Sequence, residues 1–493
     1  MNFDFNFVSL GLVLFQAYIF LTIIYLLLDN REPAETFAWI FIFILMPGIG
    51  VIIYSIVGRN GRKQYDRDKK LQQIFAKNLM GMFKPLDDVQ QDIIAGVKNR
   101  RQTYQDDLMM LLYRNSKALI TSNNKAKFFH DGRSKFDELF ADIEKAKRFI
   151  HMEYFIWCSD QDPLGRAIKE LLIKKAKEGV EVRILYDYSG CLFTMRRAYR
   201  TELRKAGVKI YPFFNYLAGF RLHTINHRNH RKIAVIDGEV AYTGGMNVGQ
   251  EYIDGGRRFA SWRDTHFKLE GGSVNLLQAI FAIDWFNTTN DESCLDPKYY
   301  SGIEASAKEM GALAIQLPTS GYDTPWPALL HLYFGMITMA QKNITIVSPY
   351  FVPEASLLTA LKTAAMRGLD VAVVMAGVHD NPLPYWAAHS YFDELLKAGV
   401  KVFQYRKGFM HAKIISVDGK ICSAGTTNFD IRSLKLNYEV NAVFYDEQTT
   451  QEIDGQIARD LKECREVTLA DLRLIGLPAR LRNSLARLLA NIL

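Results

Sequence analysis

The first sixty residues hold two long apolar runs with a short charged segment between them. No charged residue occurs from Phe7 to Leu28 or from Thr36 to Gly58. Each run is long enough to cross the roughly 30 Å hydrocarbon layer of a bilayer as a helix. The first residues lack the basic region of a cleaved secretion signal. The pattern therefore predicts a two-helix transmembrane hairpin over residues 1–58.

Basic side chains gather directly after the second run: Arg59, Arg62, Lys63, Arg67, Lys69 and Lys70. The segment between the runs has Arg31 as its one base. Because basic residues stay on the cytoplasmic side of a membrane, everything after residue 58 should lie in the cytoplasm, with the N-terminus on the same side. Residues 59–116 are expected to form a basic juxtamembrane linker.

From residue 117 onward, short β-branched runs alternate with helical patterns, and the sequence repeats itself. Three segments recur in the same order: 148–156 as 343–352, 179–185 as 368–374, and 203–210 as 395–402. Such alternation is typical of α/β units around a mostly parallel mixed sheet flanked by helices. Internal repetition indicates a duplicated fold. We expect two copies, at residues 117–305 and 306–465, that form one pseudo-twofold unit.

The pattern of the last segment, residues 466–493, predicts a basic amphipathic helix. One helical face collects apolar residues, and the arginines lie mostly off that face: Leu477, Leu481, Leu485, Leu488 and Ile492, against Arg480, Arg482 and Arg487. Such a helix suits the surface of a membrane. An ordinary helix packed on the domain is an equally good interpretation.

Composition narrows the partners without choosing among them. Of 493 residues, 61 are basic and 53 acidic, giving +8, which favours an anionic partner such as membrane lipid or nucleic acid. The five cysteines are scattered, odd in number and never in a C-x-x-C pair. That pattern argues against a zinc site and a disulfide framework, and it fits a reducing compartment.

One short polar signature occurs twice, with the same four intervals each time. Its residues are His230, Lys232, Asp237, Gly244, Gly245 and Asn247 in the first copy, and His411, Lys413, Asp418, Gly425, Thr426 and Asn428 in the second. A phosphodiester needs its charge offset, a nucleophile, and a proton for the leaving oxygen. The lysines and asparagines can bind the phosphate oxygens, while one neutral histidine attacks and one protonated histidine donates.

Two further features surround the signature. Asp237 and Asp418 each precede glycine at a strand end, so a role in the turn or in holding the neighbouring lysine is favoured over direct chemistry. The first copy also carries 11 extra residues before its histidine, which include part of the aromatic segment 211–220. This segment suits contact with lipid, although simple core packing is almost as good an interpretation.

These motifs resemble the phospholipase D superfamily, whose HxKxxxxD motif is complete in both halves. Within it the chain is similar to the bacterial cardiolipin synthases, through these segments: Asn30–Pro33, Ala38-Trp39, His227–Lys232, Gly244–Gly249 and Trp262–Asp264. The resemblance implies one site between the copies, with Asp237 and Asp418 as part of the catalytic motif. It also implies that Asp264 and Glu439 orient the histidines of the opposite copy.

The activity implied by the resemblance is phosphatidyl transfer between two phosphatidylglycerol molecules. His230 would form a covalent phosphohistidine and His411 would act as acid and base, giving cardiolipin and glycerol with no metal and no cofactor. The expected partners are phosphatidylglycerol and other anionic lipids, without nucleic acid. The expected location is the bacterial inner or plasma membrane, as a multi-pass protein with a cytoplasmic catalytic domain.

Three alternatives remain open from the sequence. A membrane phospholipase D would release phosphatidic acid, because nothing in the signature separates water from glycerol as acceptor. A phosphodiester nuclease would also use the net positive charge. A membrane scaffold with a decayed site is disfavoured because both signatures are intact.

Overall fold

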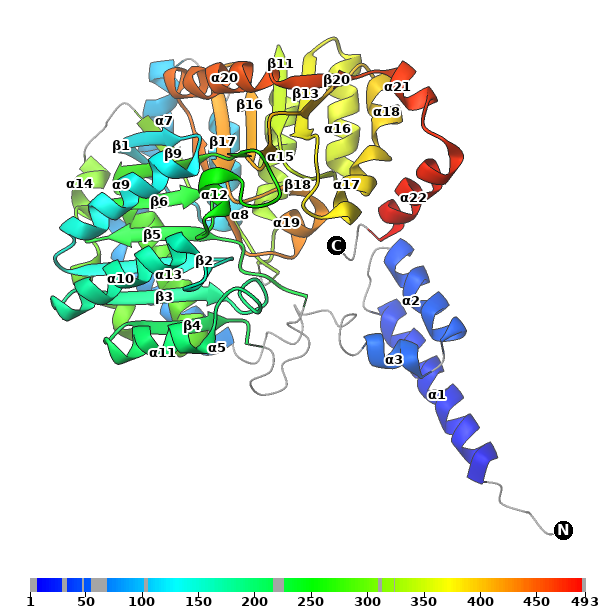
Figure 1. Ribbon diagram of the computed structural model, residues 1–493, viewed down its shortest axis with the longest axis horizontal. Coiled ribbons are helices and arrows are strands. Elements are labelled where there is room, and N and C mark those ends of the chain that lie inside the picture. The colour runs from blue at the N-terminus through cyan, green and yellow to red at the C-terminus, as the bar shows by residue number, and fades with distance from the viewer. Residues whose placement is uncertain are drawn as a thin grey trace. The chain divides into compact units, whose positions relative to one another are not determined.

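The computed structural model divides into two units (Figure 1). Unit 1 contains the N-terminal helices, and unit 2 begins at Arg67 and contains the sheet. The structure describes residues 7–28, 33–46, 48–54, 69–101, 105–215, 226–308, 313–322 and 324–489.

The N-terminal unit contains helices α1 (Phe7–Leu28), α2 (Pro33–Leu45) and α3 (Ile49–Ile53). Among the described residues, α1 supplies the one helix that is long and apolar enough to cross a membrane. The continuous second helix expected over Thr36–Gly58 is not seen in the described residues, because α2 ends at Leu45. Gly48 lies between α2 and α3 with a left-handed φ of 84°, a conformation that interrupts a helix.

These three helices share a small apolar core. Leu26, Phe43 and Tyr54 are buried in it, and Trp39 meets the ring of Tyr54 edge-on with ring centroids 5.1 Å apart. Large apolar side chains point outward instead, among them Leu12, Val13, Leu14, Phe20, Leu21, Phe37, Phe41 and Ile44. Apolar exposure on this scale is typical of helices that meet lipid.

A 16-stranded mixed sheet runs through the described part of unit 2. Copy 1 supplies β1 (Ile120–Phe129), β2 (Phe149–Tyr154), β3 (Glu181–Asp187), β4 (Lys209–Phe213), β5 (Lys232–Ile236), β6 (Val240–Gly244) and β8 (His266–Gly271). Copy 2 supplies β9 (Leu313–Gln316), β10 (Thr319–Ser320), β11 (Asn343–Val347), β13 (Asp370–Ala376), β14 (Lys401–Tyr405), β16 (Ile414–Val417), β17 (Ile421–Gly425), β19 (Glu439–Phe444) and β20 (Cys464–Val467).

The strand order repeats between the copies. Reading outward from the centre, it is β1-β8-β6-β5-β2-β3-β4 in copy 1 and β9-β19-β17-β16-β11-β13-β14 in copy 2, with β20 added at the edge. The two halves join through an antiparallel pairing of β1 with β9. Two small sheets, β7 (Trp262–Arg263) with β15 (Phe409–Met410) and β12 (Phe351–Val352) with β18 (Phe429–Asp430), lie outside this order.

The expectation of a mostly parallel sheet was wrong. In copy 1 only β2-β3-β4 are parallel, and the pairs β2-β5, β5-β6, β6-β8 and β1-β8 are antiparallel. The parallel strands are connected through helices, as the alternating pattern indicated. Strands β5 and β6 are joined by a tight turn, and so short a connection permits only antiparallel neighbours.

Helices cover this sheet (Figure 1). Those of the first half are α5 (Lys69–Met82), α6 (Lys84–Asp88), α7 (Gln90–Arg101), α8 (Asp106–Ser116), α9 (Gly132–Lys145), α10 (Pro163–Lys177), α11 (Arg197–Lys205), α12 (Glu251–Asp254) and α13 (Gly272–Thr289). The second half has α14 (Ile303–Lys308), α15 (Ala328–Met339), α16 (Ala355–Met366), α17 (Pro382–His389), α18 (Phe392–Lys397), α19 (Ile431–Lys435), α20 (Glu447–Leu461), α21 (Leu469–Arg473) and α22 (Leu477–Leu488). Two 3-10 turns lie at Glu292–Leu295 and Pro297–Tyr299.

The same tight turn follows the motif strand in each copy. Asp237 and Gly238 have φ of 53° and 67°, and Asp418 and Gly419 have 57° and 65°. Two successive left-handed residues make a type I′ turn, which matches the twist of a β-hairpin. The Asp237 carboxylate accepts hydrogen bonds from three backbone N–H groups, at residues 147–149. Asp418 does the same at residues 341–343.

Removing the Asp418 carboxylate should destabilise the fold, because the three backbone N–H groups that lead into β11, at residues 341–343, would lose their acceptor. We expect Asp418→Ala to lower the free energy of unfolding by about 2 kcal/mol, measured by denaturant titration of purified protein in detergent. The control Asp370→Ala removes an exposed ion pair with Lys401 and should cost about 0.5 kcal/mol. Unchanged stability with lost activity in Asp418→Ala would contradict a structural role.

Candidate active site

The two histidine motifs begin where the copies exchange backbone hydrogen bonds. His230 lies two residues before the start of β5, and its N–H donates to the carbonyl of Tyr438 in copy 2 over 2.9 Å. The N–H of His411 donates to the carbonyl of Arg263 in copy 1 over 2.7 Å. Each histidine is therefore positioned by the main chain of the other copy.

The imidazole side chains cross between the copies as well. Nδ1 of His230 lies 3.0 Å from a carboxylate oxygen of Glu439, and Nδ1 of His411 lies 2.6 Å from one of Asp264. Both carboxylates are fully buried. A carboxylate at Nδ1 favours the tautomer with hydrogen on that nitrogen, which leaves the lone pair on Nε2.

A lysine is tied to the main chain of each histidine. Nζ of Lys232 donates to the His230 carbonyl over 2.6 Å, and Nζ of Lys413 donates to the His411 carbonyl over 2.5 Å. Burial lowers the pKa of Lys232 to about 7 and that of Lys413 to about 8. The positive charge of Lys413 also lowers the pKa of Lys232. The two motifs thus belong to one electrostatic cluster.

Both histidines favour the neutral form. Burial lowers the pKa of His230 to about 4, although Glu439 acts in the opposite direction. Burial and the nearby Lys413 also lower the pKa of His411, against the raising effect of Asp264 and of Asp380. Neutral imidazoles with hydrogen on Nδ1 present a basic Nε2 to a substrate.

The two asparagines differ in their partners. Asn247 accepts from the backbone N–H of Ile156 over 3.0 Å and donates to the hydroxyl of Tyr252 over 2.7 Å. Among the described residues, Asn428 has a buried side-chain oxygen without a hydrogen-bond partner. Asn247 is therefore held by hydrogen bonds within the protein, whereas the side-chain oxygen of Asn428 can still accept a hydrogen bond.

The motif continues with Gly-Gly in copy 1 and with Gly-Thr in copy 2. The contacts of the second residue explain this difference. A Cβ on Gly245 would lie 1.9 Å from an oxygen of Asp264, so only glycine leaves room for that carboxylate. In copy 2 the corresponding Thr426 donates its hydroxyl to Glu439 over 2.5 Å. The copies therefore hold their carboxylates in different ways.

A second buried polar cluster behind His230 was missed by the sequence analysis. Asn229 donates to Glu153, and Arg231 donates to Asp284. Burial and the neighbouring Asp284 hold the pKa of Glu153 well above its usual range. The uninterrupted polar run at residues 227–232 was a signal for Asn229 and Arg231, but no motif marks Glu153 or Asp284.

Aromatic rings enclose the histidines. Phe155 lies 4.9 Å from His230 and Trp262 lies 5.1 Å from His411, measured between ring centroids. Within the aromatic segment 211–220, Phe213 is buried, and its ring centroid lies 5.5 Å from that of Tyr438. Residues 216–220 fall outside the described residues, so the proposed lipid contact of this segment stays a prediction.

Metal-ligating side chains do not cluster in the described part of the chain. No group of three or more His, Cys, Asp or Glu residues is arranged to hold a metal ion within that part of the chain. The five cysteines are free thiols.

Comparison with known proteins gives consistent results. A family model described as "Cardiolipin synthase, PLD-like domain" matches residues 139–257 and 333–461, which contain both motifs. A second model, "Phospholipase_D-nuclease N-terminal", matches residues 17–59.

Two similar relatives and one solved structure extend this comparison. A "Cardiolipin synthase" of Oceanobacillus iheyensis is 37% identical, with 98% of each chain covered. Another of Geobacillus sp. is 39% identical, with 94% of this chain and 90% of the relative covered. The crystal structure of phosphatidylserine synthase from Haemophilus influenzae matches with a TM-score of 0.60 at 15% identity, over 78% of this chain and 99% of that one, and so supports the fold alone.

The similarity spans nearly the whole chain, and the matched segments carry both of the histidines that cross between the copies. The chain belongs to the cardiolipin synthase family of phospholipase D-like proteins.

Proposed function

We propose that the protein is a cardiolipin synthase that transfers a phosphatidyl group from one phosphatidylglycerol to the glycerol hydroxyl of a second. The observation that carries this proposal is the crossed pair of histidine–carboxylate contacts, which assembles two imidazoles and two lysines from separate motifs. Such a set supplies a nucleophile, a proton donor and positive charge for a phosphodiester.

In the first step, Nε2 of His230 attacks the phosphorus and the bond from phosphorus to the headgroup glycerol breaks. His411, protonated at Nε2 in the substrate complex, gives that proton to the departing glycerol oxygen. Lys232 and Lys413 offset the charge that builds on the phosphate oxygens. The products of this step are free glycerol and a phosphatidyl group on His230.

In the second step, His411 removes the proton from the glycerol hydroxyl of another phosphatidylglycerol. That oxygen attacks phosphorus, the bond to His230 breaks, and cardiolipin leaves. One phosphodiester bond has been exchanged for another, so both imidazoles return to their starting forms.

The assignment of His230 as nucleophile has support from the electrostatics. Its pKa is lowered to about 4, which keeps its base form present at neutral pH. His411 has two carboxylates, Asp264 and Asp380, that act to raise its pKa. A histidine with more negative surroundings is the better candidate for the group that must become protonated.

The membrane arrangement is also proposed. Helix α1 is long and apolar enough to span a bilayer, and the apolar α2 and α3 make a second crossing plausible on composition. The basic residues that follow support a cytoplasmic catalytic domain, because basic residues favour that side of the membrane. We further propose that the matching strand orders reflect a pseudo-twofold relation between the copies.

The reaction itself can be tested on its products. Purified full-length protein in phosphatidylglycerol vesicles, with a chelator and without nucleotide, should produce cardiolipin and glycerol in equal amounts, measured by lipid mass spectrometry and a glycerol assay. Phosphatidic acid as the main product would instead indicate a phospholipase D. Loss of activity in chelator, restored by a divalent metal, would contradict the metal-free mechanism.

Separate histidine variants should identify the nucleophile. With phosphate-labelled phosphatidylglycerol, label should remain on the wild type and on His411→Ala after denaturation, and it should be absent from His230→Ala. Both variants should lose about 10²–10⁴-fold in rate, because each removes a proton-transfer or nucleophilic group. Label retained by His230→Ala and absent from His411→Ala would reverse the assignment.

The pH dependence should follow the buried lysines. Because Lys232 and Lys413 bind phosphate as ammonium ions, kcat/KM should fall as pH rises through their pKa values of about 7 and about 8. Lys232→Arg keeps its charge, so the alkaline decline should move toward the Lys413 value. The exposed control Lys84→Arg should leave the profile unchanged. An alkaline limb that does not move in Lys232→Arg would exclude Lys232 as its source.

A further inference from the structure

Helix α22 is attached to the body of unit 2 by the face that carries small and polar residues. It packs against α17, and Asn483 and Ala486 are its buried side chains. This face lies opposite the leucine stripe on a helical wheel of 3.6 residues per turn. The helix is therefore packed on the domain, as the alternative interpretation expected, but its leucines do not make that contact.

The leucine stripe of α22, defined here as Leu477, Leu481, Leu485 and Leu488, is exposed. The exposed fractions are 79%, 59%, 52% and 75% in that order. Leu474, just before the helix, is 85% exposed. A soluble helix normally buries such a stripe, and a contiguous exposed apolar surface marks a binding site.

Basic residues flank this stripe, and α22 contains no acidic residue. The guanidinium of Arg482 lies 4.7 Å from the ring centroid of Trp386. Arg487 lies over Tyr391 at 4.0 Å and pairs with Glu394 at 3.3 Å. These contacts fix α22 to α17 and α18 and keep its leucines turned outward.

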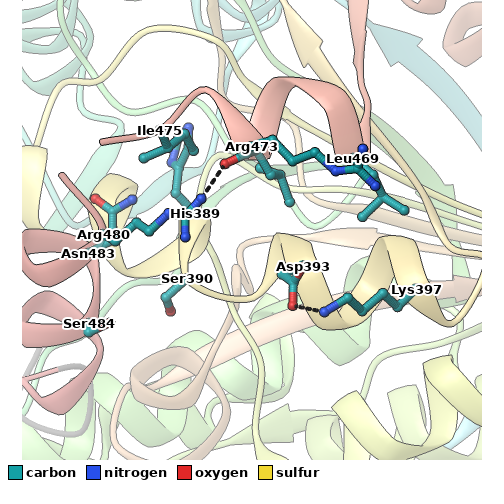
Figure 2. Close-up of a pocket in the computed structure, with 11 residues that line it drawn as sticks. His389, Ser390, Asp393, Lys397, Leu469, Arg473, Ile475, Arg480, Asn483 and Ser484 are labelled. Carbon is teal, nitrogen blue, oxygen red and sulfur yellow. Dashed lines mark hydrogen bonds and ion pairs between the residues drawn. The ribbon is translucent and has the colours of Figure 1, made fainter. Parts of the chain in front are cut away.

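A cavity of about 590 Å³ adjoins the same helix. Figure 2 shows it between the α17–α18 segment and the α21–α22 segment, with Arg473, Arg480 and Lys397 among its lining residues. Arg480 donates to the carbonyl of Leu472 over 3.2 Å, and Lys397 pairs with Asp393 at 2.7 Å. The lining also offers polar groups at Asn483 and Ser484. Positive and hydrogen-bonding groups beside exposed leucines match the two parts of an anionic lipid.

We propose that α22 is an interfacial helix that seats the catalytic unit on an anionic bilayer. The leucine stripe enters the boundary between headgroups and acyl chains, and the cavity takes a phosphate-bearing headgroup near Arg473 and Arg480. Apolar insertion combined with basic side chains at the headgroup level is the general mode of such helices. The inference rests on the proposed function in one respect only: the enzyme is taken to act at a bilayer.

A second copy of the chain fits this surface less well. In a twofold dimer through the stripe, the arginines of one α22 would face those of the other without an acidic residue from either helix. Like charges brought together in this way oppose association. An anionic membrane surface offsets the same charges.

The depth of α22 can be measured in the full-length protein. In a Cys158→Ser/Cys464→Ser background, an environment-sensitive fluorophore is attached at Leu485→Cys and the protein is reconstituted in vesicles with brominated acyl chains. We expect bromine to reduce the fluorescence at least about twofold in phosphatidylglycerol vesicles, with weaker quenching in phosphatidylcholine. The matched control is Met366→Cys, an apolar position on α16 that is 69% exposed, and it should not be quenched.

Further variants separate the possible outcomes. Arg473→Gln/Arg480→Gln should reduce the quenching at position 485 in phosphatidylglycerol, because the cavity would lose its charge. The measurement is repeated in His411→Ala, so that failure of the catalytic proposal does not affect it. Absent quenching, equal quenching in both lipids or at both positions, or a spectral change that depends on protein concentration without quenching would overturn the proposal. The last result would indicate contact between copies.

Discussion

The active site depends on buried charges that are completed only across the boundary between the copies. Glu439 and Asp264 have no exposed surface, and each reaches the histidine of the other copy. A buried carboxylate or a buried lysine without a partner would strongly destabilise the fold. Neither half can hold its histidine and carboxylate in this arrangement alone. The catalytic geometry therefore exists only when the two copies are associated.

The duplicated sheet brings the two copies together through directly paired strands. β1 and β9 join the halves in the middle, and β5 and β16 hold the motifs at matching places in the strand order. The copies are nevertheless not identical, since Gly245 makes room for Asp264 whereas Thr426 donates to Glu439. This asymmetry gives the two imidazoles different surroundings, which is what two different roles require.

Local features were predictable from the sequence because each depends on a few adjacent residues. The Asp-Gly turns follow from the tolerance of these residues for positive φ, and the motif spacing located the histidines and lysines. The antiparallel order and the cluster of Glu153, Arg231 and Asp284 depend on contacts between distant segments, which no local pattern records. The run that contains the break between α2 and α3 also contains Pro47 and Gly48, a dipeptide that signals a turn but that hydropathy alone does not register.

Burial also explains why the site should respond to its substrate. In the free protein, removal of water lowers the pKa of His230, His411, Lys232 and Lys413 together, so the cluster binds protons less readily than the same groups would in water. A phosphodiester brings a negative charge into this space and favours the protonated forms that catalysis needs. The anion therefore completes the charge balance of the site, and a neutral lipid of the same shape would not.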